Sequence, residues 1–192
     1  MGTQLDREKA LALLKAYNES ESLVNHGLAV SGVMEHFAKL EGEDPDYWGI
    51  VGLLHDLDYE KYPDQHCQKV VEILEANDYE KAFINSVVSH GFGICTDVEP
   101  THQMEKILYA TDELAGLITA CAYMRPSKSV NDLEVKSVKK KFKTASFAAG
   151  VNREVVAKGA EMAGYSLDEL MQETILAMRA VADDIGLGSN EA

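Results

Sequence analysis

Residues 52–66, GLLHDLDYEKYPDQH, carry the chain out of an apolar segment and into a run of charged and turn-forming residues. Apolar residues at helical spacing lead up to His55 and Asp56, which therefore fall near the end of a helix predicted over 45–58. An imidazole beside a carboxylate contributes little to packing, and a buried carboxylate is destabilising unless a charge partner or a metal ion compensates it. The pair therefore predicts a functional site where this helix ends.

Helical periodicity extends from this segment in both directions, with no convincing strand-like alternation and only four prolines in the chain. The predicted fold class is therefore all-α. Capping signals support the boundaries, because Asp44-Pro45 opens the helix that leads to His55 and Gly42 ends the helix before it. The predicted helices cover 5–18, 21–42, 45–58, 64–77, 79–91, 101–124, 153–164 and 167–185.

Composition places the chain among ordinary globular proteins, with 46% hydrophobic and 26% charged residues. Its net charge of −14 argues against a nucleic-acid partner, because polyanions would be repelled at long range. No apolar run is long enough for a membrane span and the N-terminus lacks a secretion-signal pattern, so we expect a cytoplasmic protein with no membrane partner. Cys67, Cys95 and Cys121 are odd in number and form no CxxC pair, which predicts buried free thiols in a reducing compartment rather than a disulfide framework.

Two further ionisable side chains lie on the predicted inward faces of other helices. His26 lies in the helix over 21–42 with Val30 four residues later, and Asp112 lies among apolar neighbours in the helix over 101–124. Together with His55 and Asp56, they favour a shared divalent cation, for which imidazole nitrogen and carboxylate oxygen are suitable ligands. A buried ion pair between His26 and either aspartate is the alternative without a metal.

The order His, then His-Asp, then Asp along an all-α chain resembles the HD-domain metal-dependent phosphohydrolases, whose H…HD…D pattern matches His26, His55-Asp56 and Asp112. The resemblance implies a helical bundle in which these four residues hold a metal ion in a cleft between helices. It also implies hydrolysis of phosphate esters or anhydrides. We expect a single HD domain over 1–192, with an HD core at about 20–125, a C-terminal helical extension at about 126–186 and a disordered tail at 187–192.

Two more histidines bear on the number of metal ions. Family members with two metals, such as the diadenosine tetraphosphate hydrolases, add histidines in the intervals where His66 and His90 lie, and the motif layout here is closer to these enzymes. The resemblance implies that His66 and His90 bind a second ion and that Asp56 bridges the two; otherwise each is a helix-end histidine that binds carbonyls. The expected cofactor is one or two divalent ions of Fe, Mn, Co, Ni, Zn or Mg.

Side chains close to the motif are candidates for catalysis. Asp56, Asp58 and Lys61 are the candidate catalytic residues, because Asp58 and Lys61 follow the motif closely enough to order water or to touch phosphate. A salt bridge within the loop is the alternative for the latter two. Glu113 is a further carboxylate of the right kind for acid or base chemistry, and the sequence does not choose among the three acids.

A lysine-rich segment at 136–143 is unusual in so acidic a chain. It predicts either a phosphate-binding rim that includes Lys139 and Lys141 or a solvated helix face. The residues that follow it, TASFAAGVNRE, resemble an uncharacterised bacterial branch of the HD proteins and have no assigned chemistry.

These assignments predict a metal-dependent phosphohydrolase that uses metal-activated water to cleave a phosphate ester or anhydride of a small nucleotide or phosphorylated metabolite. The alternatives are a regulatory HD domain that binds a nucleotide without hydrolysing it, and a metal-free helical interaction protein. A Cys-His protease that used Cys95 and His90 would leave the other four ligands unexplained. The expected partner is the small phosphorylated substrate, and a homodimer is compatible with the sequence.

Overall fold

The computed structural model describes residues 5–188, and within them the secondary structure is helical. No strand occurs in this part of the chain beyond one isolated bridge between Phe92 and Thr96. The prediction of an all-α fold is confirmed. The helices are α1 (Arg7–Tyr17), α2 (Glu21–Glu41), α3 (Pro45–Leu54), α4 (Lys69–Ala76), α5 (Lys81–Val88), α6 (Gln103–Tyr123), α7 (Val135–Phe142), α8 (Arg153–Ala163) and α9 (Leu167–Ala180), with short 3₁₀ turns η1 (Pro63–Gln65) and η2 (Ser89–Gly91).

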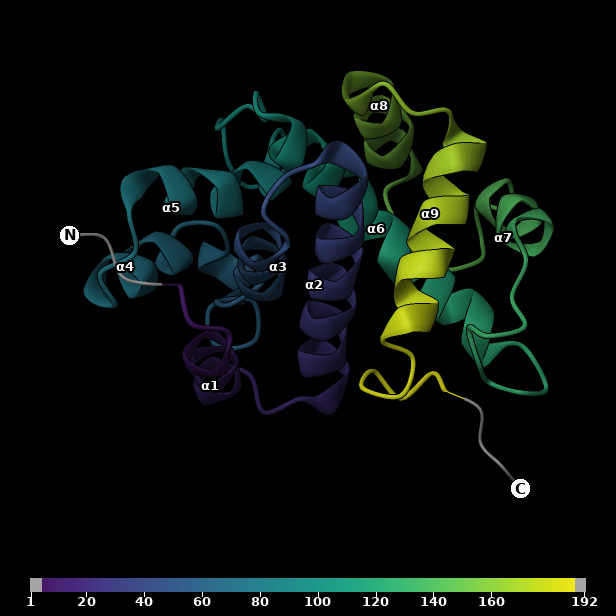
Figure 1. The fold of residues 1–192 in the computed structure, drawn as a ribbon, viewed down its shortest axis with the longest axis horizontal. Helices are drawn as coiled ribbons and strands as arrows, with labels where there is room; N and C mark the ends of the chain where they lie inside the picture. Colours follow the sequence, from purple (N-terminus) through teal and green to yellow (C-terminus); the bar gives the residue numbers. More distant parts are fainter. Residues whose placement is uncertain (1–4, 189–192) are drawn as a thin grey trace.

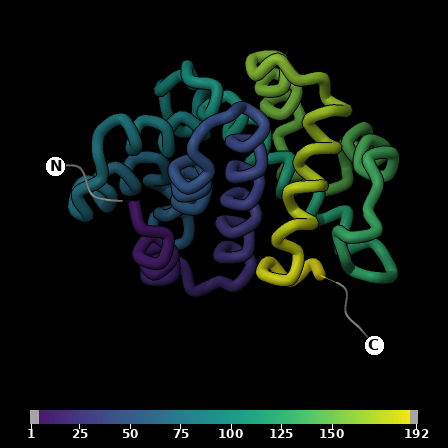
Figure 2. Tube along the Cα trace, viewed as in Figure 1, coloured from purple at the N-terminus to yellow at the C-terminus, as the bar shows by residue number. Residues whose placement is uncertain are grey.

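The two long helices α2 and α6 organise the bundle. In Figure 1, α2 stands in the middle of the molecule between α3 and α9, and α6 runs behind it. The trace in Figure 2 shows the same order, with α1, α4 and α5 on the α3 side and α7 on the α9 side. The most extensive helix contacts join α2 to α3 and α6 to α8, and α2 also contacts α6 and α9. The parts of α2, α3 and α6 that carry the site are therefore fixed by one continuous core.

Local capping explains where the site helices begin and end. The Asp44 carboxylate accepts hydrogen bonds from the backbone N–H groups of Asp46 and Tyr47, and Pro45 occupies the first turn, where its missing N–H costs nothing. Gly42 ends α2 with a φ of 74°, in the left-handed region that glycine adopts without strain. The chain can therefore turn sharply from α2 into α3, which places these two helices side by side.

Several predicted boundaries differ from the structure, since the helix predicted over 167–185 ends at Ala180 and α7 was not among the predicted helices, and two of the differences lie at the site. The helix predicted over 64–77 begins only at Lys69, because Cys67 has a φ of 67° that no α-helix can contain. His66 therefore lies in an irregular segment between η1 and α4. The helix predicted over 45–58 ends at Leu54, so that His55 is its C-cap and Asp56 begins a series of turns.

The predicted disordered tail at 187–192 is wrong at its first residue. Leu187 is 1% exposed, and its carbonyl accepts hydrogen bonds from Val130 N and Ser129 Oγ. This contact fastens the segment after α9 to the loop before α7. The rest of that prediction, from 189 onward, lies outside the described residues. None of the helices in the described part of the chain has the length and hydropathy of a membrane span.

Candidate metal centre

Three helices deliver four ionisable side chains to one point. His26 comes from α2, His55 and Asp56 from the end of α3, and Asp112 from the middle of α6. His26 Nε2 lies 2.9 Å from Asp112 Oδ1, and His55 Nε2 lies 3.2 Å from the same oxygen and 3.3 Å from Asp56 Oδ2. One potential ligand atom from each residue lies within 4.8 Å of the others, so the four side chains can hold a single ion.

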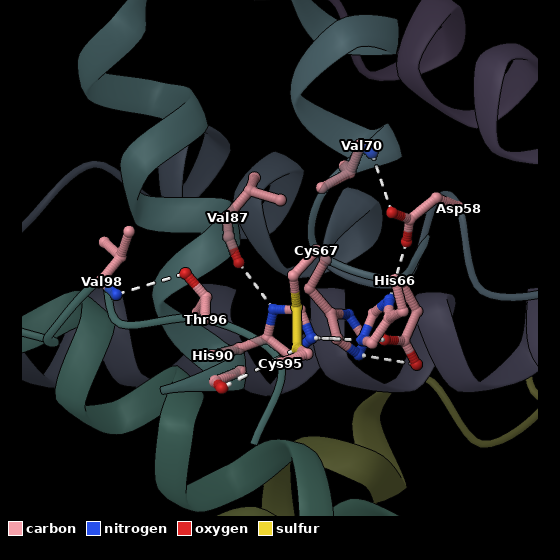
Figure 3. Close-up of a disulfide and its surroundings, with 12 residues drawn as sticks. Asp58, His66, Cys67, Val70, Val87, His90, Cys95, Thr96 and Val98 are labelled. Atoms are coloured by element: carbon pink, nitrogen blue, oxygen red, sulfur yellow. Dashed lines mark hydrogen bonds and ion pairs between the residues drawn. A yellow bond between two sulfur atoms is a disulfide. The ribbon is translucent and has the colours of Figure 1, made fainter. Parts of the chain in front are cut away.

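A second cluster shares Asp56 with the first. His66 Nε2 and His90 Nε2 lie 3.5 and 3.4 Å from Asp56 Oδ1, the oxygen that the first cluster does not use, and 3.2 Å from each other. In Figure 3 a dashed line joins the facing nitrogen atoms of His66 and His90. The two oxygens of Asp56 thus point to two different groups of histidines. This is the geometry of a carboxylate that bridges two ions.

Backbone acceptors fix the proton positions on the two buried histidines. His55 Nδ1 donates to Gly52 O and His90 Nδ1 donates to Val87 O, both at 2.7 Å. The Nε2 atom of each neutral ring must then present its lone pair to the cluster, which is how a histidine is oriented toward a metal ion. His90 thus binds the Val87 carbonyl at its helix end through Nδ1, as the alternative without a metal predicted. Its Nε2 atom still faces Asp56.

The donor set fits a divalent cation. His55 Nε2 is buried and has no hydrogen-bond partner among the described residues, although two carboxylate oxygens lie close by. In the second cluster the Nε2 atoms of His66 and His90 face each other, an arrangement that places two lone pairs in contact unless a cation or a proton lies between them. A metal ion at each group would satisfy these atoms together.

Charge in the cluster changes the pKa of its members. Burial alone would lower the pKa of His55, but the negative charges of Asp56 and Asp112 outweigh it and hold this pKa well above its usual value. The pKa values of Asp56 and Asp112 are lowered, since the charge of His55 and the hydrogen bonds from the surrounding histidines together outweigh the effect of burial. For His66, burial lowers the pKa, but the hydrogen bond to Asp58 and the negative charges of Asp56 and Asp58 together outweigh it, and the pKa is raised. Protons therefore compete with a metal for this site.

Five of the six candidate ligands, all except His55, line a cleft of about 320 Å³. Besides the ligands, the residues that line the cleft include Tyr59, Ile94, Gly150, Val155 and Glu113. The C-terminal extension therefore contributes part of its wall. None of the described residues that line the cleft is a lysine or an arginine.

The structure separates the candidate catalytic residues. Asp58 is fully buried; it accepts hydrogen bonds from His66 Nδ1 at 2.7 Å and from Val70 N at 2.8 Å, so it orients a ligand rather than facing the cleft. Lys61 donates to Ala16 O at 2.6 Å and lies over the ring of Tyr17, and it does not line the cleft. Its predicted place at the site is wrong, because the turns after Asp56 direct it toward α1.

Two lysines of the basic segment have other partners. Lys139 pairs with Asp168 at 2.7 Å, and Lys141 lies over the ring of Phe147 and lines a separate cavity of about 310 Å³. Neither lines the cleft. A role in phosphate binding stays a prediction for both.

Two features of the site were not predicted. Cys67 and Cys95 form a disulfide, so the prediction of three free thiols is wrong, and only Cys121 is a free, buried cysteine. Spacing gives no signal for a pair separated by 28 residues. Arg153 was given no chemistry. Its guanidinium donates to the backbone carbonyls of residues 142, 144, 147, 148 and 151 and so folds the loop that brings Gly150 to the cleft.

Comparison with known proteins agrees with this geometry. Residues 23–117 match the HD domain family. All six candidate ligands of the two clusters fall inside the matched segment, and the match supports membership of the HD superfamily. HD domains have an all-α fold, bind divalent metals and are generally metal-dependent hydrolases. Neither a curated protein nor a solved structure gives a match to this chain.

Proposed function

We propose that this protein is a metal-dependent phosphohydrolase that cleaves a phosphate ester or anhydride of a small nucleotide or phosphorylated metabolite. The proposal rests on one observation: the two oxygens of Asp56 face two separate histidine clusters, each of which directs Nε2 atoms inward. Paired ions held in this way are used by many enzymes that transfer or hydrolyse phosphoryl groups. A purely structural ion pair would need neither the second cluster nor the open cleft above it.

The ligands divide into two sets. His26, His55, Asp56 and Asp112 would hold one ion, and Asp56, His66 and His90 would hold a second. Divalent ions bound here would supply Lewis acidity toward the phosphoryl oxygens and a lowered pKa for a bound water.

Residues around the ligands have separate tasks in this proposal. Asp58 fixes the ring orientation of His66 through its Nδ1 hydrogen bond. Glu113 is the candidate proton carrier among the three predicted carboxylates, because it lines the cleft while both oxygens of Asp58 are already engaged. Asn152 N donates to Glu113 Oε2 at 2.9 Å, which holds the carboxylate beside Asp112.

Cleft size and charge favour a small substrate. A volume of about 320 Å³ lies near the lower end of the range for ligand-binding cavities, about 300 to 1,000 Å³. The described lining residues include acidic but no lysine or arginine side chains, so the negative charge of a phosphate must be balanced by the bound ions. Compounds with one phosphate are better matched to such a cleft than long polyphosphates. The layout of the motif nevertheless makes a dinucleotide polyphosphate a necessary member of the test panel.

The test is hydrolysis by the purified chain after loading with Mn²⁺, Co²⁺, Ni²⁺, Zn²⁺, Fe²⁺ or Mg²⁺. The panel contains nucleoside mono-, di- and triphosphates, a diadenosine polyphosphate, a cyclic nucleotide and simple phosphomonoesters. We expect metal-dependent release of phosphate or nucleotide from at least one compound, and its loss in His55→Ala. His36→Ala is the matched control, because His36 pairs with Glu173 outside the cleft. Thermal stabilisation by a nucleotide without turnover would instead identify a binding domain.

A further inference from the structure

The disulfide joins the two segments that carry the second histidine pair. Cys67 directly follows His66, and Cys95 lies in the turn that begins after His90 and Gly91. Figure 3 shows the bond between these sulfur atoms beside the two imidazoles. A Cβ atom added at Gly91 would overlap both sulfur atoms, so the disulfide packs directly on the backbone next to His90. The positions of His66 and His90 are therefore coupled through one covalent bond.

The same bond lies in a wall between two cavities. The metal-site cleft of about 320 Å³ and an outer cavity of about 490 Å³ share His66, Ile94 and Cys95 in their linings. The outer cavity is also bordered by Pro63 and Asp97, from the two segments that the disulfide connects. Cys95 can thus be approached from the outer side, while Cys67 is 3% exposed. Cys95 is therefore the cysteine that a small thiol would approach first.

Cys67 belongs to a large apolar core, which also stabilises the fold without a cross-link. Small secreted domains use disulfides because their cores are too small, whereas this chain has one continuous core that extends through α2, α3, α6 and α9. The one free cysteine, Cys121, is buried near the C-terminal end of α6. Burial raises the pKa of its thiol to about 11. The only cross-link in the described part of the chain is placed at the second ligand pair.

We propose that Cys67 and Cys95 form a reversible redox site whose disulfide holds His66 and His90 in position for the second ion. Reduction weakens binding of that ion and leaves binding at His26, His55, Asp56 and Asp112 intact. The inference rests on the two-ion centre of the proposed function, and it is independent of which phosphate compound is hydrolysed.

The exchange involves a dithiol as the reductant. One of its thiolates attacks Cys95 Sγ, the bond between the two cysteine sulfurs breaks, and the Cys67 thiolate leaves and takes up a proton. The second thiol of the reductant then attacks the mixed disulfide and releases Cys95. Two electrons and two protons pass to the protein, and the reductant becomes a disulfide. A disulfide oxidant of the same class reverses the reaction.

Local backbone geometry explains why the ligand pair responds to reduction. Cys67 has a φ of 67°, which a residue with a side chain adopts at a cost unless its surroundings impose it. After the bond breaks, the turn between His66 and α4 can relax, and the segment that includes Ile94 and Cys95 is no longer tied to it. Asp58 still holds the His66 ring, but nothing covalent then sets the distance from His66 to His90.

The experiment compares the second Mn²⁺ equivalent in oxidised and reduced protein. Bound ion is measured from the electron paramagnetic resonance of free Mn²⁺, with oxidised glutathione or a phosphine reductant used to set the redox state. Alkylation and mass spectrometry count the thiols of the denatured chain. We expect one free thiol when oxidised and three when reduced. Reduction should raise the Kd of the second ion by about ten-fold or more, a size typical when the support of a metal ligand is lost.

Variants separate the disulfide from general effects of the reductant. The double variant Cys67→Ser/Cys95→Ser should bind the second ion weakly in both redox states, while Cys121→Ser should respond to reduction like the natural chain. Circular dichroism confirms that each variant is folded. Equal affinity for the second ion in the oxidised and reduced natural chain would overturn the proposal, as would three free thiols after oxidation. A redox response in a chain that hydrolyses nothing would preserve this inference and refute the proposed function.

Discussion

At the scale of single residues, Asp56 and Asp58 have different roles in the second cluster, which consists of Asp56, His66 and His90. Asp56 presents one oxygen to each histidine cluster. Asp58 does not line the cleft and instead accepts a hydrogen bond from His66 Nδ1. A carboxylate that accepts from the distal nitrogen of a histidine fixes its tautomer and makes the other nitrogen a better ligand. The affinity of the second site should therefore depend on a residue that touches neither metal nor substrate.

Replacing this support gives a graded effect. In Asp58→Asn the side chain keeps one acceptor oxygen but loses the charge and cannot accept from both His66 Nδ1 and Val70 N. We expect the Kd of the second Mn²⁺ equivalent to rise about 10- to 100-fold, with activity recovering at high metal concentration. Asp64→Asn, an exposed neighbour in η1, is the control and should bind normally. Unchanged affinity in Asp58→Asn would show that His66 needs no such support.

The pH dependence of stability should reverse when metal is removed. The pKa of His55 in the folded protein is raised above its unfolded value of about 6.5, so without metal its stabilisation is complete below that pH and is lost as the pH rises through the folded pKa. We expect the Tm of chelated protein to fall as the pH rises above about 6.5, while Mn²⁺-loaded protein, whose histidines must be neutral, is increasingly stabilised relative to it. A constant difference in Tm above that pH would contradict the assignment.

The sequence predicted which residues belong to the site better than it predicted where their side chains point. The four residues of the HD pattern, His26, His55, Asp56 and Asp112, converge as the inward faces of their helices require. Lys61 could not be placed from sequence, because it follows turns whose direction depends on contacts with α1. The disulfide escaped prediction for a related reason: the αL conformation at Cys67 breaks a segment whose residues otherwise suit a helix.

At the scale of elements, the approach of α8 to α6 shapes the cleft. A Cβ atom added at Gly159 would lie 2.6 Å from Ala110 Cβ and 2.8 Å from Ala110 Cα, so the two helices meet at a contact that admits only glycine. Ala110 precedes Asp112 on α6, and Val155 on α8 lines the cleft. Helix spacing at this point therefore controls both stability and the shape of the cleft wall.

Gly159→Ala tests this coupling. The added methyl group should push α8 outward and lower the free energy of unfolding by about 1 to 3 kcal/mol, despite the higher helix propensity of alanine. Gly116→Ala, in α6 where the nearest atom lies 4.0 Å from the added Cβ, is the matched control and should be neutral or stabilising. Denaturant unfolding measures both variants. Equal stability of the two variants would mean that α8 yields without cost.

Element boundaries were predictable where capping is local and failed where tertiary contacts decide. Asp44-Pro45 and Gly42 mark the observed ends of α3 and α2. The end of the chain was less readable, because Leu187 is ordered by hydrogen bonds to residues 129 and 130, far away in sequence. Arg153 likewise acts only after the loop from 142 to 151 has folded around it.

At the scale of the whole molecule, charge works against an anionic substrate. The net charge is −14, and the cleft is lined by acids without a lysine or arginine among the described residues. Raising ionic strength from about 0.01 to 0.15 M shortens the screening length from about 30 to 8 Å. We expect kcat/KM for an anionic substrate to rise over this range, by a factor on the order of two to ten, at saturating metal. A fall would instead favour the predicted rim of Lys139 and Lys141, which their alanine variants would then test.

The all-α architecture was predictable as a whole, because helical periodicity extends over nearly every described segment. Composition could not indicate where positive charge would lie. The lysines of 136–143 are concentrated in sequence, yet Lys139 pairs with an acid of α9 and Lys141 lies over an aromatic ring. Such local pairings depend on side-chain neighbours that periodicity does not specify.

The packing at Gly91 limits which amino acids can replace this glycine during evolution. Its missing side chain leaves the space that both cysteine sulfur atoms occupy. A larger residue at position 91 thus fits only in relatives that have already lost the cross-link. Loss of a cysteine, in contrast, does not require any change at Gly91. Cys67, Gly91 and Cys95 should therefore occur together among relatives. Relatives without the two cysteines should be the ones in which a larger residue has replaced the glycine.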